Sequence, residues 1–396
     1  MPPADQAQRV RAHTRDIEFD FVRWTINALG VKLNQLSLGT SNYLSSEAKH
    51  QLVIDYLNLV LSIQQAEGQL NLIFGDPNIK DPQAASESLR DQLDGLYEQR
   101  KTLAPVAEEI LQNQLSTVAS DMGLTLGGQP VPPVLYHSTS LPWALIISPR
   151  DEIRQEVDIN LIPDLTVDQH VDLEEQVDQS LDVSSLVVGI GGIGLYPTMI
   201  SHTSNLNWLS EIIAHEWTHN FLGLRPLGIN YLTSPELRTI NETAASIAGK
   251  EIGLALLERY YPEFVPPPPP PPAPTDEVAP EPEPPSFDFR AQMHETRVNT
   301  DELLAEGKIV EAEQYMEQRR QFLWENGYRI RKLNQAYFAF YGAYADLPGG
   351  AAGADPVGAA VRELRAQSPS LAAFLNRISW MSSFEQLLGA LESGSP

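Results

Sequence analysis

The chain contains no cysteine among its 396 residues. This absence excludes disulfide bonds, thiolate metal ligands and catalysis by a cysteine nucleophile, and it leaves the redox state of the native compartment open. Any zinc site in this protein must therefore be built from nitrogen and oxygen ligands. The 8 histidines and 52 acidic residues are the side chains that provide such atoms.

Basic residues are few compared with acidic ones. Lysine and arginine number 27 against 52 aspartates and glutamates, which gives a formal net charge of −25. An acidic surface repels the phosphates of nucleic acids and of anionic lipids, so we expect neither as a partner. Solubility is the simplest consequence of this charge.

The sequence also lacks an apolar run of about 20 residues, the length that a transmembrane helix needs. The nearest candidate, residues 185–200, is shorter and is interrupted by glycines. The first residues lead into a polar, charged segment with no visible signal peptide. We expect a soluble protein, cytoplasmic by default, or extracytoplasmic if an upstream signal or anchor has been removed. The oligomeric state is left undetermined.

Apolar spacing and composition divide the chain into regions. Long stretches with a 3.6-residue apolar period, such as 84–122 with Pro105 as a possible kink, predict helices. The predicted fold class is α+β and predominantly helical. The predicted regions are an N-terminal helical region (1–128), a core of strands and helices (129–265), a proline-rich linker or insert (266–286) and a C-terminal helical region that completes the core (287–396).

Short runs rich in β-branched residues, 143–147 and 157–161, predict strands. His170 lies on an acidic helix between these runs and the next, and we expect it in solvent rather than on a metal. Residues 186–194 carry four glycines without the features of a nucleotide-binding loop. They predict either a bulged core strand or an edge strand that can pair with an extended peptide. We expect one small mixed sheet, from about 143–195, packed on the helix that follows.

That following helix carries the pattern on which the functional prediction rests. Residues His215–His219 read HEWTH, with two histidines four positions apart. Side chains at this spacing lie on one face of a helix, so both imidazoles can bind a single zinc ion. Glu216 between them can then act as general base on a water at that ion. Polar caps at 204–205 and apolar residues at helical spacing support the helix itself.

A hydrolytic zinc site needs a third protein ligand and an open fourth position. Four glutamates follow the motif at suitable distance: Glu236, Glu242, Glu251 and Glu258. Glu242 is favoured because the residues after it are small (Thr, Ala, Ala and Ser), so its helix can pack closely on the zinc helix. We therefore predict that Zn²⁺ is held by His215, His219 and Glu242.

Residues 241–245, Asn-Glu-Thr-Ala-Ala, resemble the second motif of the gluzincin metallopeptidases, the class that contains thermolysin and the zinc aminopeptidases. Together with HEWTH and a tyrosine-rich stretch over 333–344, they are most similar to the bacterial putative aminopeptidase family. The resemblance covers roughly residues 185–345. It implies a zincin-like core in which His215, His219 and Glu242 bind zinc and Glu216 is the general base.

The chain departs from these relatives at two places. Thermolysin has an aspartate four residues after its ligand glutamate, where this chain has Ser246, so a different group must orient the ligands. The Gly-x-Met-Glu-Asn motif, which holds the substrate amine in one aminopeptidase branch, is absent. Aminopeptidase and endopeptidase activity therefore both stay open.

The predicted reaction is hydrolysis of a peptide bond in a peptide or protein substrate, with a zinc-activated water and Glu216 as general base. Tyr337, Tyr341 and Tyr344 are spaced four and three apart and so share one face of a helix. They are either donors to the oxyanion or an aromatic core face. The alternative function is a zinc-binding scaffold or peptide-binding protein with vestigial hydrolysis, and the presence of Glu216 favours the enzyme.

Overall fold

The computed structural model describes residues 3–75, 79–267, 287–344, 351, 353 and 355–393. Helices account for 66% and strands for 9%, which confirms the prediction of a predominantly helical α+β fold. No helix of these residues is long and apolar enough to cross a membrane. Most of the predicted proline-rich linker, from residue 268 on, lies outside the described residues.

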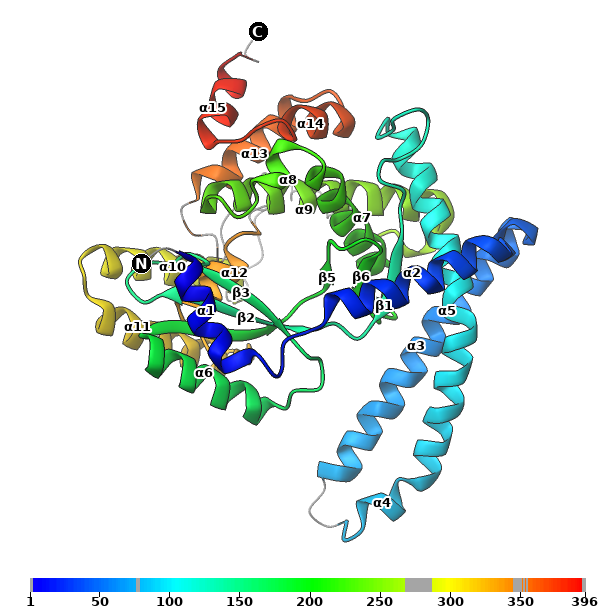
Figure 1. Cartoon of the computed structure of the whole chain (residues 1–396), viewed down its shortest axis with the longest axis horizontal. Helices are drawn as coiled ribbons and strands as arrows, with labels where there is room; N and C mark the ends of the chain where they lie inside the picture. The colour runs from blue at the N-terminus through cyan, green and yellow to red at the C-terminus, as the bar shows by residue number, and fades with distance from the viewer. Residues whose placement is uncertain are drawn as a thin grey trace, which may run out of the picture.

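The elements follow one another as labelled in Figure 1, with two short 3-10 helices, η1 and η2. The first half comprises α1 (Pro3–Thr14), α2 (Phe21–Leu38), η1 (Thr40–Tyr43), α3 (Ser46–Gly75), α4 (Pro82–Ala85), α5 (Glu87–Asp121), β1 (Tyr136–Thr139), β2 (Trp143–Pro149), β3 (Val157–Leu161), α6 (Val167–Leu181) and β4 (Val183–Gly189). The second half comprises β5 (Gly192–Ile193), β6 (Thr198–Ser201), α7 (Leu206–Gly223), α8 (Pro226–Ile229), α9 (Pro235–Tyr260), η2 (Pro262–Phe264), α10 (Phe289–Ala305), α11 (Ile309–Glu325), α12 (Gln335–Tyr341), α13 (Pro356–Gln367), α14 (Leu371–Ile378) and α15 (Phe384–Ser393).

Helices α7 and α9 form the closest-packed pair in the centre of the molecule. Both begin at a polar cap: the side chains of Asn205 and Ser234 accept hydrogen bonds from backbone N–H groups of the first turn. Gly249 and Gly253 of α9 face the backbone of α7. A Cβ at either position would lie 2.9 Å from backbone atoms of Glu211. Only glycine allows the two helices to approach this closely, as the small residues of α9 predict.

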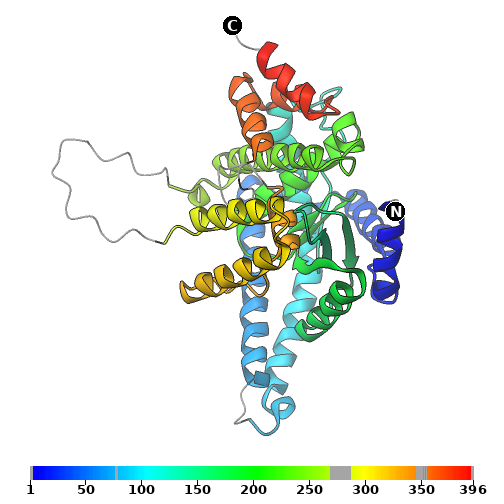
Figure 2. The ribbon, with the colours of Figure 1, turned by 90° about the vertical axis from the view of Figure 1, so that its left-hand side faces the viewer.

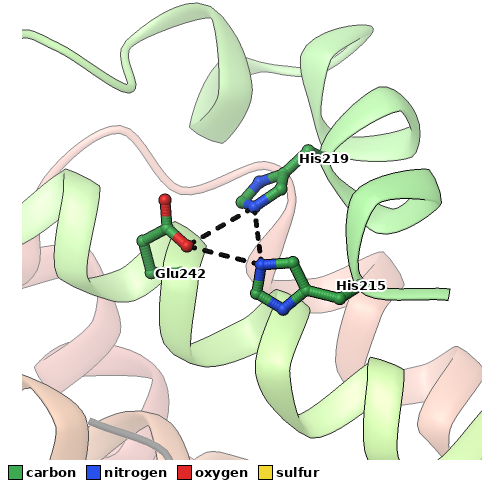
Figure 3. Close-up of side chains that lie close together, drawn as sticks. All are labelled: His215, His219 and Glu242. Atoms are coloured by element: carbon green, nitrogen blue, oxygen red, sulfur yellow. Dashed lines mark hydrogen bonds and ion pairs between the residues drawn. The ribbon is translucent and has the colours of Figure 1, made fainter. Parts of the chain in front are cut away.

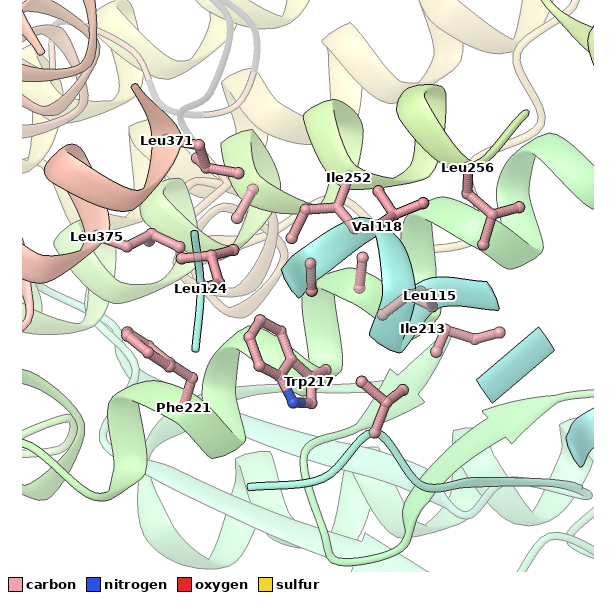
Figure 4. Close-up of a cluster of buried hydrophobic side chains, with 14 of the residues drawn as sticks. Leu115, Val118, Leu124, Ile213, Trp217, Phe221, Ile252, Leu256, Leu371 and Leu375 are labelled. Atoms are coloured by element: carbon pink, nitrogen blue, oxygen red, sulfur yellow. The ribbon is translucent and has the colours of Figure 1, made fainter. Parts of the chain in front are cut away.

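One large apolar core surrounds this pair (Figure 4). Trp217 and Phe221 of α7 and Ile252 of α9 are buried against side chains of α5 and α14. The cluster takes residues from three of the four regions predicted from the sequence, between Val53 and Leu387. The regions that flank the central part therefore share its core, and the predicted boundaries at 128, 265 and 286 stay predictions.

A long helical arm projects from this core. Helices α3 and α5 pack along each other and extend away from the rest of the molecule, as two views at right angles show (Figures 1 and 2). A separate apolar cluster that includes Ile63 and Leu93 holds the arm together. The helix α5 continues through Pro105 without a break, and the carbonyl of Pro105 accepts a hydrogen bond from Gln35 of α2 at 2.9 Å.

A buried polar network joins α2, α5 and the strands of the central part. The ammonium group of Lys32 donates to the Glu108 carboxylate, whose other oxygen accepts from the backbone N–H of Ser138 at 2.8 Å. The hydroxyl of Ser138 lies 2.8 Å from Nδ1 of His202. His202 directly follows β6, and it faces this network.

The strands form two sheets instead of the single mixed sheet that the sequence predicts. The antiparallel sheet has the order β3-β2-β4, and the mixed sheet has the order β1-β6-β5 with β1 parallel to β6. The mixed sheet packs on α7, whereas the antiparallel sheet packs between α6 and α12. The prediction was wrong here because it placed strands that are neighbours in the sequence in one sheet. After β4, the glycine-rich turn leads instead into β5, which belongs to the other sheet.

His170 on α6 is buried, and the prediction that it lies in solvent was wrong. Its ring packs edge-on against Trp143 of β2, with the centroids 4.5 Å apart. The helix is acidic along most of its length, but His170 lies on the face that covers the sheet.

Candidate metal centre

Three side chains from α7 and α9 converge on one point (Figure 3). The Nε2 atoms of His215 and His219 are 3.1 Å apart, and Oε2 of Glu242 lies 3.5 Å from the first and 3.4 Å from the second. The two histidines are neighbours because they are one helical turn apart on α7. The glutamate reaches them from α9 because the glycines of that helix allow close packing.

The spacing of these atoms fits a tetrahedral metal ion. With bonds of about 2.0–2.1 Å, the ligand atoms of a tetrahedral zinc ion lie about 3.3 Å from one another. The three observed separations, 3.1, 3.4 and 3.5 Å, are close to that value. The chemistry of the donors agrees, since two imidazoles and a carboxylate are zinc ligands that require no cysteine.

The Glu242 carboxylate supplies a second observation. The residue is 4% exposed, and its Oε2 atom has no hydrogen-bond partner among the described residues. A buried carboxylate oxygen without a donor is costly unless a cation compensates it. The oxygen without a partner is the one that faces both imidazoles. The residues present therefore fit a bound divalent ion.

Each ligand is oriented by a further side chain. Nδ1–H of His219 donates to Oδ1 of Asn241 at 2.8 Å, which leaves Nε2 as the ligand atom. The hydroxyl of Tyr231 donates to Oε1 of Glu242, so Oε2 is left for the metal. Ser246, at the position where thermolysin has an aspartate, lies with its Oγ 3.5 Å from Nδ1 of His215. Asn241, Tyr231 and Ser246 together take the place of the aspartate partner that this sequence lacks.

The surroundings shift the pKa values of Glu216 and Glu242 in opposite directions. Burial raises the pKa of Glu216. Burial also acts to raise the pKa of Glu242, but the imidazoles of His219 and His215 outweigh it and hold that pKa well below its usual range. For His219, burial lowers the pKa and the Glu242 carboxylate raises it, with a net rise to about 9. Glu242 is thereby a charged ligand, whereas Glu216 is a group that can carry a proton.

Glu216 faces the same cavity as the three ligands. The cavity has a volume of about 360 Å³ and is bounded by α7, α9, β3, β5 and the end of α12. Strand β5 passes directly over it: a Cβ on Gly192 would lie 2.7 Å from Cγ of Glu216, and one on Gly194 would lie 2.9 Å from Cβ of His219. These glycines therefore lie against Glu216 and His219 of the candidate site.

No protein-family model, curated protein or solved structure matches this chain. The likeness to gluzincins therefore stays a prediction from the two sequence motifs. The functional assignment rests on the geometry of the site.

The three candidate tyrosines are separated in the structure. Tyr344 lines the cavity, and its ring lies nearly parallel to that of His215 with the centroids 6.2 Å apart. The rings of Tyr337 and Tyr341 contact each other, with their centroids 4.5 Å apart, and neither residue is among those that line the cavity. Helix α12 ends at Tyr341, so Tyr344 leaves the face that the spacing predicts for all three.

The other glutamates considered as third ligand lie away from the histidines. Glu236 and Glu258 are exposed on α9. Glu251 forms a two-point ion pair with Arg365 of α13, at 2.7 and 2.8 Å. Of these four glutamates, only Glu242 is grouped with His215 and His219.

Several residues of the cavity escaped the sequence-based prediction. Tyr231 lies between the two motifs and belongs to neither, and Asp158 lies in a predicted strand with no chemical signal. Arg238 precedes Glu242 by one helical turn, a spacing that could have drawn attention to it. Asn241 was noted in the motif without a role. These residues come from segments far apart in the sequence, so short patterns cannot reveal them together.

Proposed function

We propose that this chain is a zinc-dependent metallopeptidase that hydrolyses peptide bonds with Glu216 as general base. The observation that carries the proposal is the placement of Glu216. It is 6% exposed and lines the cavity beside His215, His219 and Glu242, but it is not one of the three converging ligands. A site that only binds a metal has no need of a fourth buried group with this position.

A zinc ion held by the two histidines and Glu242 supplies Lewis acidity, which lowers the pKa of water and polarises a carbonyl group. Glu216 accepts a proton from the attacking water and passes it to the nitrogen of the leaving amine. Burial supports this role because it raises the pKa of Glu216. A carboxylate with a raised pKa is a stronger base for accepting a proton near neutral pH. Tyr344 lines the cavity and carries a hydroxyl group that can donate to a developing oxyanion.

The edge of the mixed sheet supports a peptide as substrate. Strand β5 is the last strand in the order β1-β6-β5, and it runs above Glu216. An extended peptide can pair with an open strand edge through its backbone, independently of its side chains. Gly192 and Gly194 have no side chains to fill the space between such a peptide and the metal ligands.

Replacement of Glu216 by glutamine tests the proposal. The amide keeps the size of the side chain and removes its basic oxygen, so zinc content and melting temperature should stay near those of the wild type. Turnover should fall by about 10²–10⁴-fold or more. Zinc stoichiometry, thermal melting and cleavage of a mixed peptide pool are measured for both proteins. Glu236→Gln, an exposed position on α9, is the matched control and should cleave like the wild type.

The outcomes separate the two predicted functions. Equal cleavage by wild type and Glu216→Gln would show that another base, or a contaminant, is responsible. A fully zinc-loaded wild type that cleaves no peptide would favour the zinc-binding scaffold.

A further inference from the structure

A buried arginine forms part of the wall of the cavity. Arg238 lies on α9 one turn before Glu242, is 8% exposed and lines the same cavity as the metal ligands. Arginine keeps its charge in proteins, and burial of a charge is costly unless it is paired. This side chain therefore needs an explanation beyond the packing of its helix.

The bonds of Arg238 leave part of its guanidinium group unused. Nη1 donates to the backbone carbonyl of Ala339 on α12 at 2.9 Å. Among the described residues, the buried Nε–H group of Arg238 has no hydrogen-bond partner. The bond to Ala339 explains how the group is positioned, and the carboxylates of Glu242 and Asp158 act on its charge without forming an ion pair with it in the described part of the chain.

Two further groups face this wall. Asp158 of β3 lines the cavity and accepts a hydrogen bond from Gln155 at 3.3 Å. Tyr231 lies nearby and donates its own hydrogen to Glu242. Tyr231 also interacts with Arg238 but is uncharged, and Asp158 forms no ion pair with it in the described part of the chain. An anion that enters the cavity thus meets a fixed guanidinium group in its wall.

We propose that Arg238 binds a carboxylate group of the peptide substrate and thereby selects substrates with an anion close to the scissile bond. The proposal rests on the peptidase function and names its substrate class. A guanidinium group binds a carboxylate through parallel N–H···O bonds, which fix orientation as well as charge. The carboxylate can be the free C-terminus of a peptide or the side chain of an aspartate or glutamate.

The position of Arg238 sets the distance to the reacting bond. Side chains four apart on a helix have their Cβ atoms about 5–6 Å from each other, so Arg238 and the ligand Glu242 are neighbours. An extended peptide advances about 3.3–3.6 Å per residue. A carboxylate held by Arg238 therefore lies one or two residues from the bond that Glu216 serves. The cavity of about 360 Å³ is near the lower end for ligand pockets, in keeping with so short a segment.

Matched peptides test the proposal on the wild-type protein without any variant. The first pair is N-acetyl-Ala-Ala-Phe-Ala with a free carboxylate and the same peptide as the amide. The second pair consists of C-terminal amides that carry either aspartate or asparagine in the last position. We expect at least a 10-fold higher kcat/KM for the anionic member of one pair, mainly through KM, and the pair that shows it identifies the source of the carboxylate.

Variants then connect the preference to Arg238. Arg238→Gln should abolish the difference between acid and neutral peptides, and Arg238→Lys should retain part of it because the charge remains. Asp158→Asn removes an anion from the same wall. It should therefore strengthen binding of the anionic peptide, whereas Arg238→Gln should weaken it. Weaker binding of the anion by Asp158→Asn would contradict the proposed arrangement. Melting temperatures show whether each variant is folded.

A binding measurement separates this proposal from the peptidase function. Calorimetry with Glu216→Gln should show at least 10-fold tighter binding of the anionic peptide, lost in Glu216→Gln/Arg238→Gln. Cleavage by the wild type with no preference for the anionic member of either pair would overturn the role of Arg238 and leave the peptidase intact. Preference in binding without any cleavage would overturn the peptidase and keep the carboxylate site.

Discussion

Each metal-ligand candidate is held by a second side chain, and the one on Glu242 comes from outside the two ligand helices. Tyr231 follows α8 and donates to Oε1 of Glu242, which directs Oε2 toward the imidazoles. Partners of this kind fix the orientation of a ligand before the metal binds, and their loss commonly costs 10–100-fold in metal affinity. The conformation of the segment around α8 is thus part of the metal centre.

We predict that Tyr231→Phe weakens zinc binding by about 10-fold, since the phenyl ring keeps the packing and only the donor to Glu242 is lost. Competition with a chelator of known affinity measures the change. Tyr341→Phe, a tyrosine outside the cavity lining, is the matched control and should bind zinc like the wild type. Equal zinc affinity for all three proteins would show that Tyr231 does not orient the ligand.

His202 gives a prediction about pH. Burial lowers its pKa to about 4, with Arg100 and His137 adding to the effect and Glu108 opposing it. The unfolded chain has the ordinary value of about 6.5. Above pH 6.5 neither state is protonated, so the full stability is present. Between pH 6.5 and about 4 only the unfolded state takes up the proton, so stability falls as the pH is lowered.

We expect this histidine to cost about 2 kcal/mol of unfolding free energy between pH 7 and pH 4.5. His202→Asn keeps a polar group beside Ser138 and cannot titrate, so its stability should depend less on pH by that amount. Urea unfolding at the two pH values measures the difference. Parallel pH profiles for the two proteins would contradict the assignment of a neutral, partly buried His202.

At the residue level the sequence reveals what is local. His215, Glu216 and His219 form one helical turn, so their spacing alone predicts that they face one way. Glu242 follows on the next long helix and could be chosen from its small neighbours. Arg238 shares that helix but carries no signal of its own, because an arginine in a helix is most often exposed and its burial here depends on distant segments such as α12. The burial of His170 depends likewise on which face of α6 meets the sheet.

At the level of elements, the metal centre depends on how closely α7 and α9 pack. His215 and His219 belong to one helix and Glu242 to the other, so the ligand spacing is set by the separation of two backbones. Gly249 lies where the two helices are in close contact: a Cβ there would be 2.9 Å from the carbonyl oxygen of Glu211 and 3.0 Å from Cβ of His215. Any side chain at this position must push the helices apart.

We predict that Gly249→Ala lowers the free energy of unfolding by about 1–3 kcal/mol, the usual cost of overpacking, and also weakens zinc binding. Gly68→Ala is the control. It lies within α3, and an added methyl group there would meet no atom within 4 Å, so the better helix propensity of alanine should stabilise the protein by up to about 1 kcal/mol. Chemical denaturation measures both. A stabilising Gly249→Ala would mean that the helices are not in close contact.

The helices were easier to predict than the sheets. The capped, periodic segments that became α6, α7 and α9 carry their signals within a few residues. Strand pairing depends on contacts between distant residues: β1 pairs with β6 across some 60 residues, and Tyr136 lies opposite Thr198. The pattern of β-branched residues located β2 and β3 but could not show that β5 and β6 join β1 in a different sheet.

At the level of the whole molecule, the metal centre lies within the largest apolar core. Helices α7 and α9, which supply the ligands, also supply Trp217, Ile252 and many other side chains of that core. An ion bound at the proposed site would connect the two helices in addition to their packing. Binding of a ligand to the folded state alone raises stability by mass action, by about 4 kcal/mol when free zinc is 1,000 times its Kd.

We therefore expect removal of zinc with a chelator to lower the melting temperature by several degrees, and addition of zinc to restore it. The double variant His215→Ala/His219→Ala should bind little zinc, and its melting temperature should not respond to the chelator. Elemental analysis should give about one zinc per wild-type chain. Equal zinc content in the two proteins would exclude this site.

The arm of α3 and α5 has a consequence for work with the purified protein. The arm extends away from the core in both views, and the 35 residues of α5 alone measure about 52 Å from end to end. A particle with such a projection diffuses more slowly than a sphere of equal mass. On a gel-filtration column calibrated with globular proteins, the monomer should elute earlier than a globular protein of its mass, 43.9 kDa. Early elution is thus no sign of a dimer, and the mass should be taken from light scattering.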